Sequence, residues 1–318
     1  MSVRVLAAAV TAVTLAVPSL SVAQAPAGSD DGWTVPRTAD GRPVLQGVWD
    51  YRTITPLERP ESLAGRDFLT PEEVADLEAR ALERNTDEAR PADAARDVSG
   101  AYNDFWWDRG QKVVPTGRTS LIVDPPDGRI PHVDRARSTR RTPRGYDGPE
   151  SRNLWERCLT RALPRLSGAY NNNFQIVQSA GVVAIINEMI HEVRLIPINS
   201  GPHADPKIRQ WAGDSRGHWE GDTLVVDTTN FSDKTSFRGS GENLHLVERF
   251  TRISDNTLLY EFTVDDPTTW SRPWSAEFPI AKNEALIYEY ACHEGNYGMT
   301  NLLRGARVQE REALLGSR

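Results

Sequence analysis

Apolar and polar positions alternate in short segments over residues 174–293, and turn residues separate these segments. A period of two predicts β-strands that each bury one face. The expected strands are 174–179, 182–197, 217–221, 223–231, 244–253, 257–265, 274–280 and 285–293. Consecutive strands of this kind pair as antiparallel hairpins, and enough of them can close into a barrel without free edges. The pattern therefore predicts a mainly β fold built on an antiparallel barrel.

One strand and one helix are expected before this series. Residues 45–51 alternate like a first strand. Thr70 can cap a helix that has Pro71 in its first turn, where the missing N–H is harmless, and Glu73 completes a capping box. A single apolar stripe then continues to about Arg84. The spacing predicts an N-terminal surface helix.

The rest of the N-terminal half has little periodicity. Residues 85–99 are charged and rich in Ala, and residues 119–124 read as a short strand that ends in a Pro-Pro-Asp-Gly turn. We therefore expect the strand, the helix and long decorating loops of 24–165 to pack on a barrel core. That core, followed by a C-terminal tail, occupies 166–318.

The first residues have the layout of a secretory signal peptide. Arg4 precedes an apolar run at 5–17, and small residues follow. The run is too short to span a bilayer. Cleavage after Ala23 is favoured over cleavage after Ala25, because Pro26 would hinder the second cut; the signal peptide is then 1–23. We expect a periplasmic or secreted protein that does not insert into a membrane.

Charge and cysteine content narrow the function classes further. A net charge of -7 argues against a nucleic-acid partner, which normally requires a basic face, and the basic run at 129–144 is interpreted as a solvated loop. Cys158 and Cys292 predict one disulfide in an exported chain. In the chain-entropy model, such a bond stabilises the fold by about 4–5 kcal/mol. A catalytic thiol is the alternative, although a thiol tends to oxidise outside the cell.

Several longer motifs carry a resemblance to known proteins. Gly47-Val48-Trp49 and Gly217-His218-Trp219 look like the G-x-W feature of lipocalin-like (calycin) barrels. The chain also resembles a family of exported bacterial proteins of unassigned function. That likeness rests on LQGVW, RTSLIVDPPDGRIP, WEGDTLVVDTTNF, LHLVERFTR, DDPTTWSRPW and YEYACHEGNYG. The resemblance implies one exported, lipocalin-like unit and no particular activity.

Histidines in the strand series are the main candidates for chemistry. Three of the six, His191, His245 and His293, fall inside or at the ends of separate expected strands. Because side chains alternate across a strand, His191 and Glu192 point to opposite faces, as do His245 and Glu248. A working site must therefore be assembled between strands.

Two interiors are compatible with this alternation. If the histidine faces turn inward, His191, His245, His293 and Glu289 form a catalytic set, with Asn187 and Arg249 binding substrate. If the opposite faces turn inward, Glu188, Glu192, Arg194 and Glu248 form an ion cluster instead. Two further residues are candidate ligand contacts, Trp106 in the aromatic run 102–107 and Asn172 in an Asn-rich segment before a strand.

The leading hypothesis is an enzyme that acts on a small organic molecule, aromatic or carbonyl-bearing, by general acid–base chemistry. A lyase, isomerase or hydrolase without an organic cofactor fits this chemistry. Three histidines can also hold zinc with one coordination site open, which is the alternative cofactor. Two other functions stay open: a lipocalin-like protein that binds a small ligand without catalysis, and an interaction or scaffold protein of the cell envelope.

Overall fold

The computed structural model describes residues 32–84, 110–133 and 145–316. The signal peptide at 1–23, Trp106 and most of the basic run at 129–144 lie outside these residues. By their internal contacts, residues 32–318 form one compact unit. No helix of the described ranges combines the length and the apolar character needed to cross a membrane.

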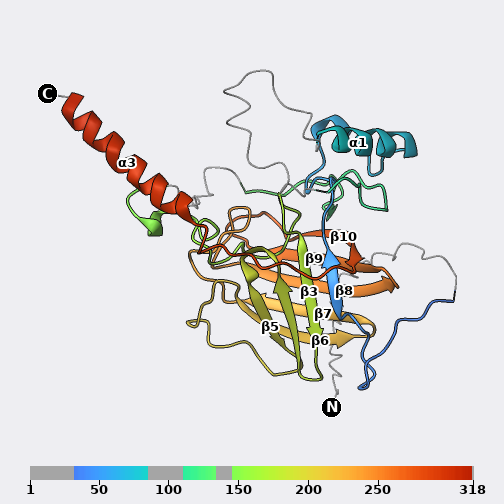
Figure 1. The fold of residues 1–318 in the computed structure, drawn as a ribbon. Helices are drawn as coiled ribbons and strands as arrows, with labels where there is room; N and C mark the ends of the chain where they lie inside the picture. The colour runs from blue at the N-terminus through green and yellow to red at the C-terminus, as the bar shows by residue number, and fades with distance from the viewer. Residues whose placement is uncertain (1–31, 85–109, 134–144, 317–318) are drawn as a thin grey trace, which may run out of the picture. The chain divides into compact units, whose positions relative to one another are not determined.

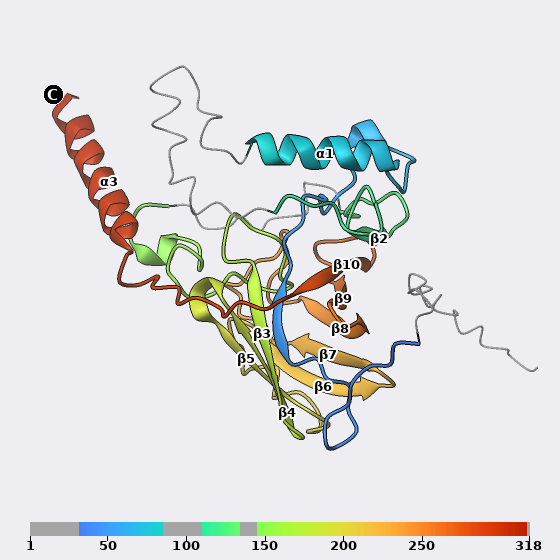
Figure 2. The ribbon, with the colours of Figure 1, turned by 45° about the vertical axis from the view of Figure 1, so that its right-hand side comes forward.

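The expectation of a mainly β fold is confirmed by a ten-stranded antiparallel sheet (Figures 1 and 2). Its ladder order is β5-β4-β3-β1-β10-β9-β8-β7-β6, and β2 pairs with β10 off this path. The strands are β1 (Gly47–Asp50), β2 (Ile122–Asp124), β3 (Asn173–Gln178), β4 (Val182–Asn187), β5 (Val193–Pro197), β6 (Asp214–Glu220), β7 (Thr223–Thr229), β8 (His245–Ser254), β9 (Thr257–Asp265) and β10 (Trp274–Asn283).

The two terminal strands of this order meet at one point. Ile198 and Gly217 form an isolated parallel bridge, and the Asn199 N–H donates to the Gly217 carbonyl oxygen at 2.8 Å. A Cβ on Gly217 would lie 2.6 Å from Cδ1 of Ile198 and 2.8 Å from Cγ2 of Ile196, so a larger residue would have to displace these side chains. Within the described residues, no ladder joins β5 to β6, and the sheet is open between them.

Aromatic side chains fill the inner face of the sheet. The rings of Phe250 and Tyr260 stack at 4.9 Å, and Trp270 meets Trp274 edge-on at 5.6 Å. All four rings are buried. Burying a large apolar side chain stabilises a fold by about 1.5–3 kcal/mol, so these rings contribute substantially to the stability of the sheet.

The N-terminal helix forms as expected. It is α1 (Pro71–Arg84), and its capping box is complete: the Thr70 N–H donates to Glu73 Oε2 at 2.8 Å, and the Glu73 N–H donates to Thr70 Oγ1 at 3.3 Å. Val74 and Leu77 pack against the core. A local signal of this kind depends on no distant partner, which explains why the sequence predicts it well.

The single strand expected at 182–197 is wrong. A short 3-10 helix at Met189–His191 separates β4 from β5, with Ile190 (φ 64°) and His191 (φ 42°) in left-handed conformations. The Asn187 N–H donates to the Glu192 carbonyl oxygen at 2.9 Å and closes the turn. Because the chain reverses here, the alternation of faces does not continue from β4 into β5.

The strand expected at 285–293 is also wrong. Residues 284–296 lack strand structure, since β1 and β9 already occupy the two edges of β10. This segment bonds instead to the turn before β5: the Tyr288 N–H donates to Glu188 Oε1 at 2.9 Å. The expected C-terminal tail contains a helix, α3 (Tyr297–Gly316), in which no residue is buried.

The predicted disulfide is confirmed, and it joins two segments without regular strand structure. Cys158 in the loop before β3 bonds to Cys292 in the segment after β10. Asn296 adds a second link, because its Nδ2 donates to the Glu156 carbonyl oxygen at 3.0 Å. The Asn296 side chain also accepts from the Met299 N–H at 3.2 Å, which caps the start of α3.

Candidate functional site

The inner face of β8 carries the glutamate and not the histidine. Leu246, Glu248 and Phe250 are buried, whereas His245 and Arg249 lie on the opposite face. Of the two interiors that the sequence leaves open, the structure therefore has the one with Glu248 inside. His245 points outward because the opposite face of β8 carries the apolar residues Leu246 and Phe250, which pack into the core.

Glu248 belongs to a buried polar group. Its Oε2 lies 2.6 Å from Arg194 Nη2, and the two side chains are only 3% and 6% exposed. The Tyr260 hydroxyl donates to Glu248 Oε1 at 2.8 Å. Burial, and next the charge of Glu248, raise the pKa of Tyr260 well above its ordinary value, so the phenol stays protonated.

A small cavity of about 20 Å³ adjoins this group. That volume has room for about one water molecule. Asn187 lines it, and three buried atoms around it, Asn187 Oδ1, Arg194 Nε and Arg165 Nε, have no hydrogen-bond partner among the described residues. Asn187 and Arg194, placed on opposite faces by counting along one strand, thus share one cavity.

A larger cavity, here called the mouth cavity, lies next to the small one. Its volume is about 180 Å³, and Tyr51 and Arg165 line both spaces. A third cavity of about 670 Å³ shares Leu166, Ser167, Gly168 and Arg238 with the mouth cavity. The remaining walls of the mouth cavity are Arg161, Pro164, Tyr170, Asn172, Met189 and Phe237.

Three arginines of the mouth cavity differ in their partners. Arg165 forms an ion pair with Glu192. Arg161 lies over the Trp155 ring, 5.2 Å from its centroid, and its Nη1 is 2.9 Å from Met189 Sδ. Burial, and the nearby charge of Arg165, lower the pKa of Arg161 despite opposing contributions from neighbouring tyrosines. No carboxylate of the described residues pairs with Arg161 or Arg238.

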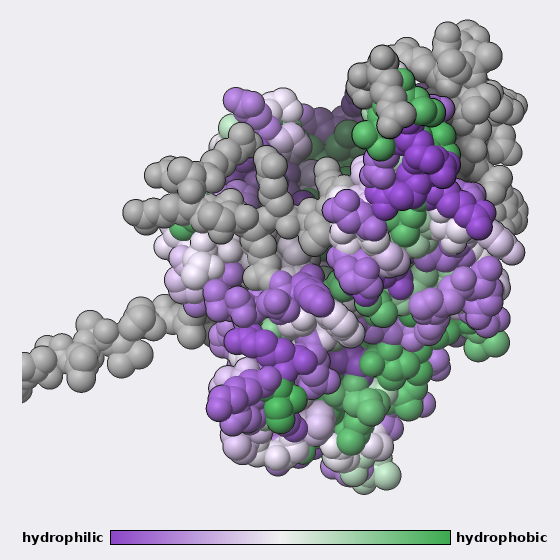
Figure 3. All heavy atoms as spheres, turned by 90° about the vertical axis from the view of Figure 1, so that its left-hand side faces the viewer, coloured by the Kyte–Doolittle hydropathy of each residue, from purple (hydrophilic) through white to green (hydrophobic). Residues whose placement is uncertain are grey.

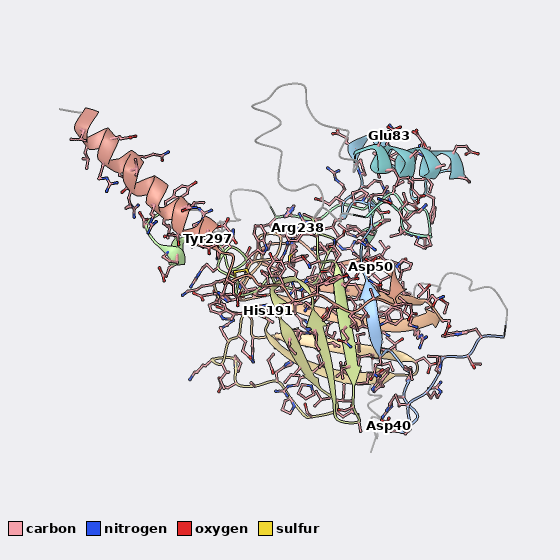
Figure 4. All side chains as sticks on the ribbon, viewed as in Figure 1. Asp40, Asp50, Glu83, His191, Arg238 and Tyr297 are labelled. Atoms are coloured by element: carbon pink, nitrogen blue, oxygen red, sulfur yellow. A yellow bond between two sulfur atoms is a disulfide. The ribbon has the colours of Figure 1, made fainter. Side chains whose placement is uncertain are left out.

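Arg238 sits at the tip of a two-residue turn. Phe237 and Ser240 exchange N–H···O bonds of 3.1 and 2.9 Å, while Arg238 (φ 50°) and Gly239 (φ 95°) are both left-handed. This conformation costs a non-glycine residue roughly 1–2 kcal/mol. The base of the turn is firmly held, because Ser240 Oγ donates to buried Asp266 at 2.6 Å. Figure 4 labels Arg238 and His191 at the same end of the sheet.

Other left-handed residues gather in the loops around the mouth cavity. Cys158, Ala162 and Asn171 adopt positive φ in the segment before β3, as do Ile190 and His191 in the turn before β5. Strained backbone of this kind is concentrated at functional sites. The mouth cavity is therefore the candidate site that the backbone geometry favours.

The histidines expected to form one site lie in different places. His191 is in the 3-10 helix, and its Nδ1 donates to the Tyr290 carbonyl oxygen at 2.9 Å. His293 and Glu289 belong to the segment that follows β10. His245 contacts Asp227 on the outer face of the sheet, where Arg249 also lies and pairs with Glu220 at 2.8 Å.

Of the other expected ligand contacts, the structure places two beside cavities. Asn172 is buried at the mouth cavity, and its Oδ1 accepts from the Gly168 N–H at 2.6 Å. Asn187 lines the small inner cavity. Trp106 lies outside the described residues. Asn172 was predicted from an Asn-rich segment before a strand, and Asn187 from the face that it was expected to share with His191; Arg161, Arg165 and Arg238 were not among the candidates.

The outer face of β6 and β7 holds a chain of carboxylates and imidazoles. His245 Nε2 lies 2.9 Å from Asp227 Oδ2, and His203 bridges Asp227 at 2.9 Å and Asp214 at 3.0 Å. The hydrogen bond to Asp227 raises the pKa of His245. Burial raises the pKa of Asp227, but its bonds and charge interactions with His245 and His203 outweigh this and lower it.

The part of the chain that the structure describes contains no cluster of candidate metal ligands. There, no three or more His, Cys, Asp or Glu side chains are arranged to hold a metal ion. Comparison of the chain with protein-family models, with curated proteins and with solved structures finds no match.

Proposed function

We propose that the protein binds a small organic molecule in the mouth cavity. The observation that carries this proposal is the pair of adjoining cavities of about 180 and 670 Å³. Small-molecule pockets usually measure about 300–1,000 Å³ and combine apolar walls with a few polar groups. Here Tyr51 and Phe237 supply aromatic wall, and Asn172 with the arginines supplies polar atoms.

The proposed architecture is a lipocalin-like barrel with its ligand at the mouth. The contact between Ile198 and Gly217 supports it, because this contact brings the two terminal strands of the sheet together. Ligand cavities are common in the mouths of β-barrels. Export to the periplasm or the outside of the cell is part of the same proposal, supported by the apolar leader and by the Cys158–Cys292 disulfide.

General acid–base catalysis is the second candidate, and one observation favours it. Asp227 holds the imidazole of His245 through Nε2 and raises its pKa, while the side chain is 46% exposed. A carboxylate that orients a reachable imidazole is a common arrangement for a catalytic base. This pair lies on the outer face and has no cavity among those described above, which ranks it second.

A neutral dye tests the binding proposal. We expect N-phenyl-1-naphthylamine to bind the full-length mature chain saturably, with an increase in fluorescence. Gly168→Leu should weaken this binding at least tenfold, because a Cβ at Gly168 lies 3.6 Å from Arg161 Nη2 and the larger side chain extends into the mouth cavity.

Gly181→Leu is the matched control. Gly181 lies in the turn between β3 and β4, at the end of β4 away from Asn187, and a Cβ there meets nothing within 4 Å. Dye binding should be unchanged in this variant. Equal affinities in all three folded proteins, or no saturable binding at all, would refute the proposal.

A further inference from the structure

We infer that the ligand of the mouth cavity is an organic anion, an aromatic or apolar body with a carboxylate or similar oxyanion group, held by Arg161 and Arg238. This inference rests on the proposed function, and it adds the chemical class of the ligand. It is drawn from the charges that face the cavity, from the surroundings of Arg161 and from the turn that carries Arg238.

The charges around the mouth cavity do not balance. Three guanidinium groups line it, and Glu192 pairs with only one of them, Arg165. The other nearby carboxylate, Glu188, is already bonded to Asn173 Nδ2 at 2.7 Å and to the Tyr288 N–H at 2.9 Å. Two positive charges therefore remain without a carboxylate among the described residues, and an anion would complete the set.

Arg161 has unsuitable partners for a guanidinium. It stacks on an indole ring and approaches a thioether sulfur, which is only a weak acceptor. Its planar set of N–H donors matches two oxygens of one carboxylate. The lowered pKa of Arg161 agrees with this arrangement, because burial and the charge of Arg165 both disfavour its charged form until an anion is present.

Arg238 is held in place by a turn that favours other residues. Positions with positive φ in a two-residue turn normally carry Asn, Asp or Gly. An arginine there is unfavourable for the turn itself, yet the Asp266 bond and the stacking of Phe237 on Trp274, with centroids 6.0 Å apart, fix the turn. The turn thus holds the guanidinium of Arg238, which has no carboxylate partner among the described residues, in the wall that the mouth cavity shares with the cavity of about 670 Å³.

The remaining groups suit an aromatic or apolar body on the ligand. Tyr51 is almost fully buried and lines the mouth cavity, and burial raises its pKa, so its phenol stays neutral. Phe237, the neighbour of Arg238 in the turn, also lines this cavity. A strongly hydrated inorganic anion would leave these walls without a partner, whereas an aromatic carboxylate or sulfonate would contact both.

Two dyes with the same aromatic body test the inference. The probes are 1-anilinonaphthalene-8-sulfonate, which is anionic, and N-phenyl-1-naphthylamine, which is neutral. We expect the anionic dye to bind at least tenfold more tightly. Arg161→Gln and Arg238→Asn should each weaken it about tenfold, as expected for loss of a charge-assisted hydrogen bond, and should change binding of the neutral dye less than twofold. Asn suits the left-handed position, so the second variant keeps the turn.

Arg157→Gln is the charge-matched control. Arg157 lies in the same loop as Arg161 but is not part of the mouth cavity. If this variant weakens the anionic dye as much as the other two, general surface charge explains the effect and the inference is wrong. If the neutral dye binds and Gly168→Leu blocks it while both dyes bind equally, the inference fails and the proposed function stands. If neither dye binds the folded protein, both fail.

Discussion

The mouth cavity and the outer face of β6 to β8 both gather ionisable side chains, yet they pair them differently. On the outer face, His203 and His245 each contact a carboxylate, and Arg249 pairs with Glu220. At the mouth cavity, Arg161 and Arg238 have no carboxylate partner in the described residues. The difference lies in the pairing of the charged residues and not in their type: the outer network is complete in itself, whereas the mouth cavity keeps two arginines that the proposed anion could pair with.

Exposure to water explains why the charged pairs on the outer face affect the stability of the sheet little. Four of the paired groups on the outer face, His245, Asp227, Arg249 and Glu220, keep about a third to a half of their side-chain surface in water, for example 38% for Arg249 and 49% for Glu220. Such pairs change stability little. The charges of Arg194 and Glu248, by contrast, are almost fully removed from water and depend on each other. Figure 3 shows one face of the molecule, on which a patch of apolar side chains lies among hydrophilic ones.

The largest effect is expected inside the sheet. Glu248→Gln leaves the Arg194 guanidinium buried without its carboxylate, which should lower the free energy of unfolding by about 3–5 kcal/mol. Urea unfolding followed by circular dichroism measures the change. Adding Arg194→Met to this variant should recover most of the loss, because the second substitution removes the unpaired charge. A loss below 1 kcal/mol in the single variant would mean that the inner pair behaves like an exposed one.

An intermediate effect is expected at Asp227, and it should depend on pH. Asp227→Asn should cost about 1 kcal/mol, since these partly exposed pairs are weakened by solvent. His245 has a raised pKa, so its contribution is complete below its ordinary value of 6.5 and is lost as pH rises through the higher folded value. Asp227 has a lowered pKa, so its contribution is present above 3.8 and is lost as pH falls through the lower folded value.

The difference between wild type and Asp227→Asn should therefore be largest between about pH 4 and 6.5 and smaller on both sides. Urea unfolding at a series of pH values measures it, and a constant difference from pH 3 to 9 would contradict the pairing. The same variant bears on the acid–base candidate. Any turnover found in a panel of carbonyl and ester substrates should fall at least tenfold without this carboxylate.

The smallest effect is expected at Glu220 on the outer face, where a Glu→Gln substitution repeats the one proposed for Glu248 on the inner face. Glu220→Gln removes the partner of Arg249 and of His218. Because both partners remain exposed to water, the free energy of unfolding should change by less than about 1 kcal/mol, and added salt should reduce the change. A loss as large as that of Glu248→Gln would overturn the contrast between the two faces.

Features that depend on nearby residues were the ones that the sequence predicted well. The capping box placed α1, and β9 (Thr257–Asp265) has the predicted bounds because a turn signal precedes an unbroken alternation. The disulfide followed from the presence of only two cysteines in a chain with an apolar leader. The helix and the strand each depend on a short stretch, and two cysteines can pair with each other in only one way.

Errors arose where the decision was made by distant residues. Nothing at 188–192 resembles a turn, and the reversal there became visible only with Ile190 and His191 in left-handed conformations. The alternation at 285–293 was not used, because β10 already had neighbours on both sides. The candidate site was missed for the same reason: Arg161 and Arg238 are 77 residues apart, in loops without periodicity, and only the folded sheet brings them to one cavity.

The disulfide gives this site a topological setting. Cys158 lies three residues before Arg161, and its bond to Cys292 turns the intervening chain, from β3 through β10, into a covalent ring whose closure adjoins the mouth cavity. Opening the ring would release the loop that positions Arg161. Because thermodynamic linkage is reciprocal, a ligand that requires this arginine in place also opposes reduction of the bond. If the anion proposed above binds there, its binding and the closure of this ring stabilise the same loop.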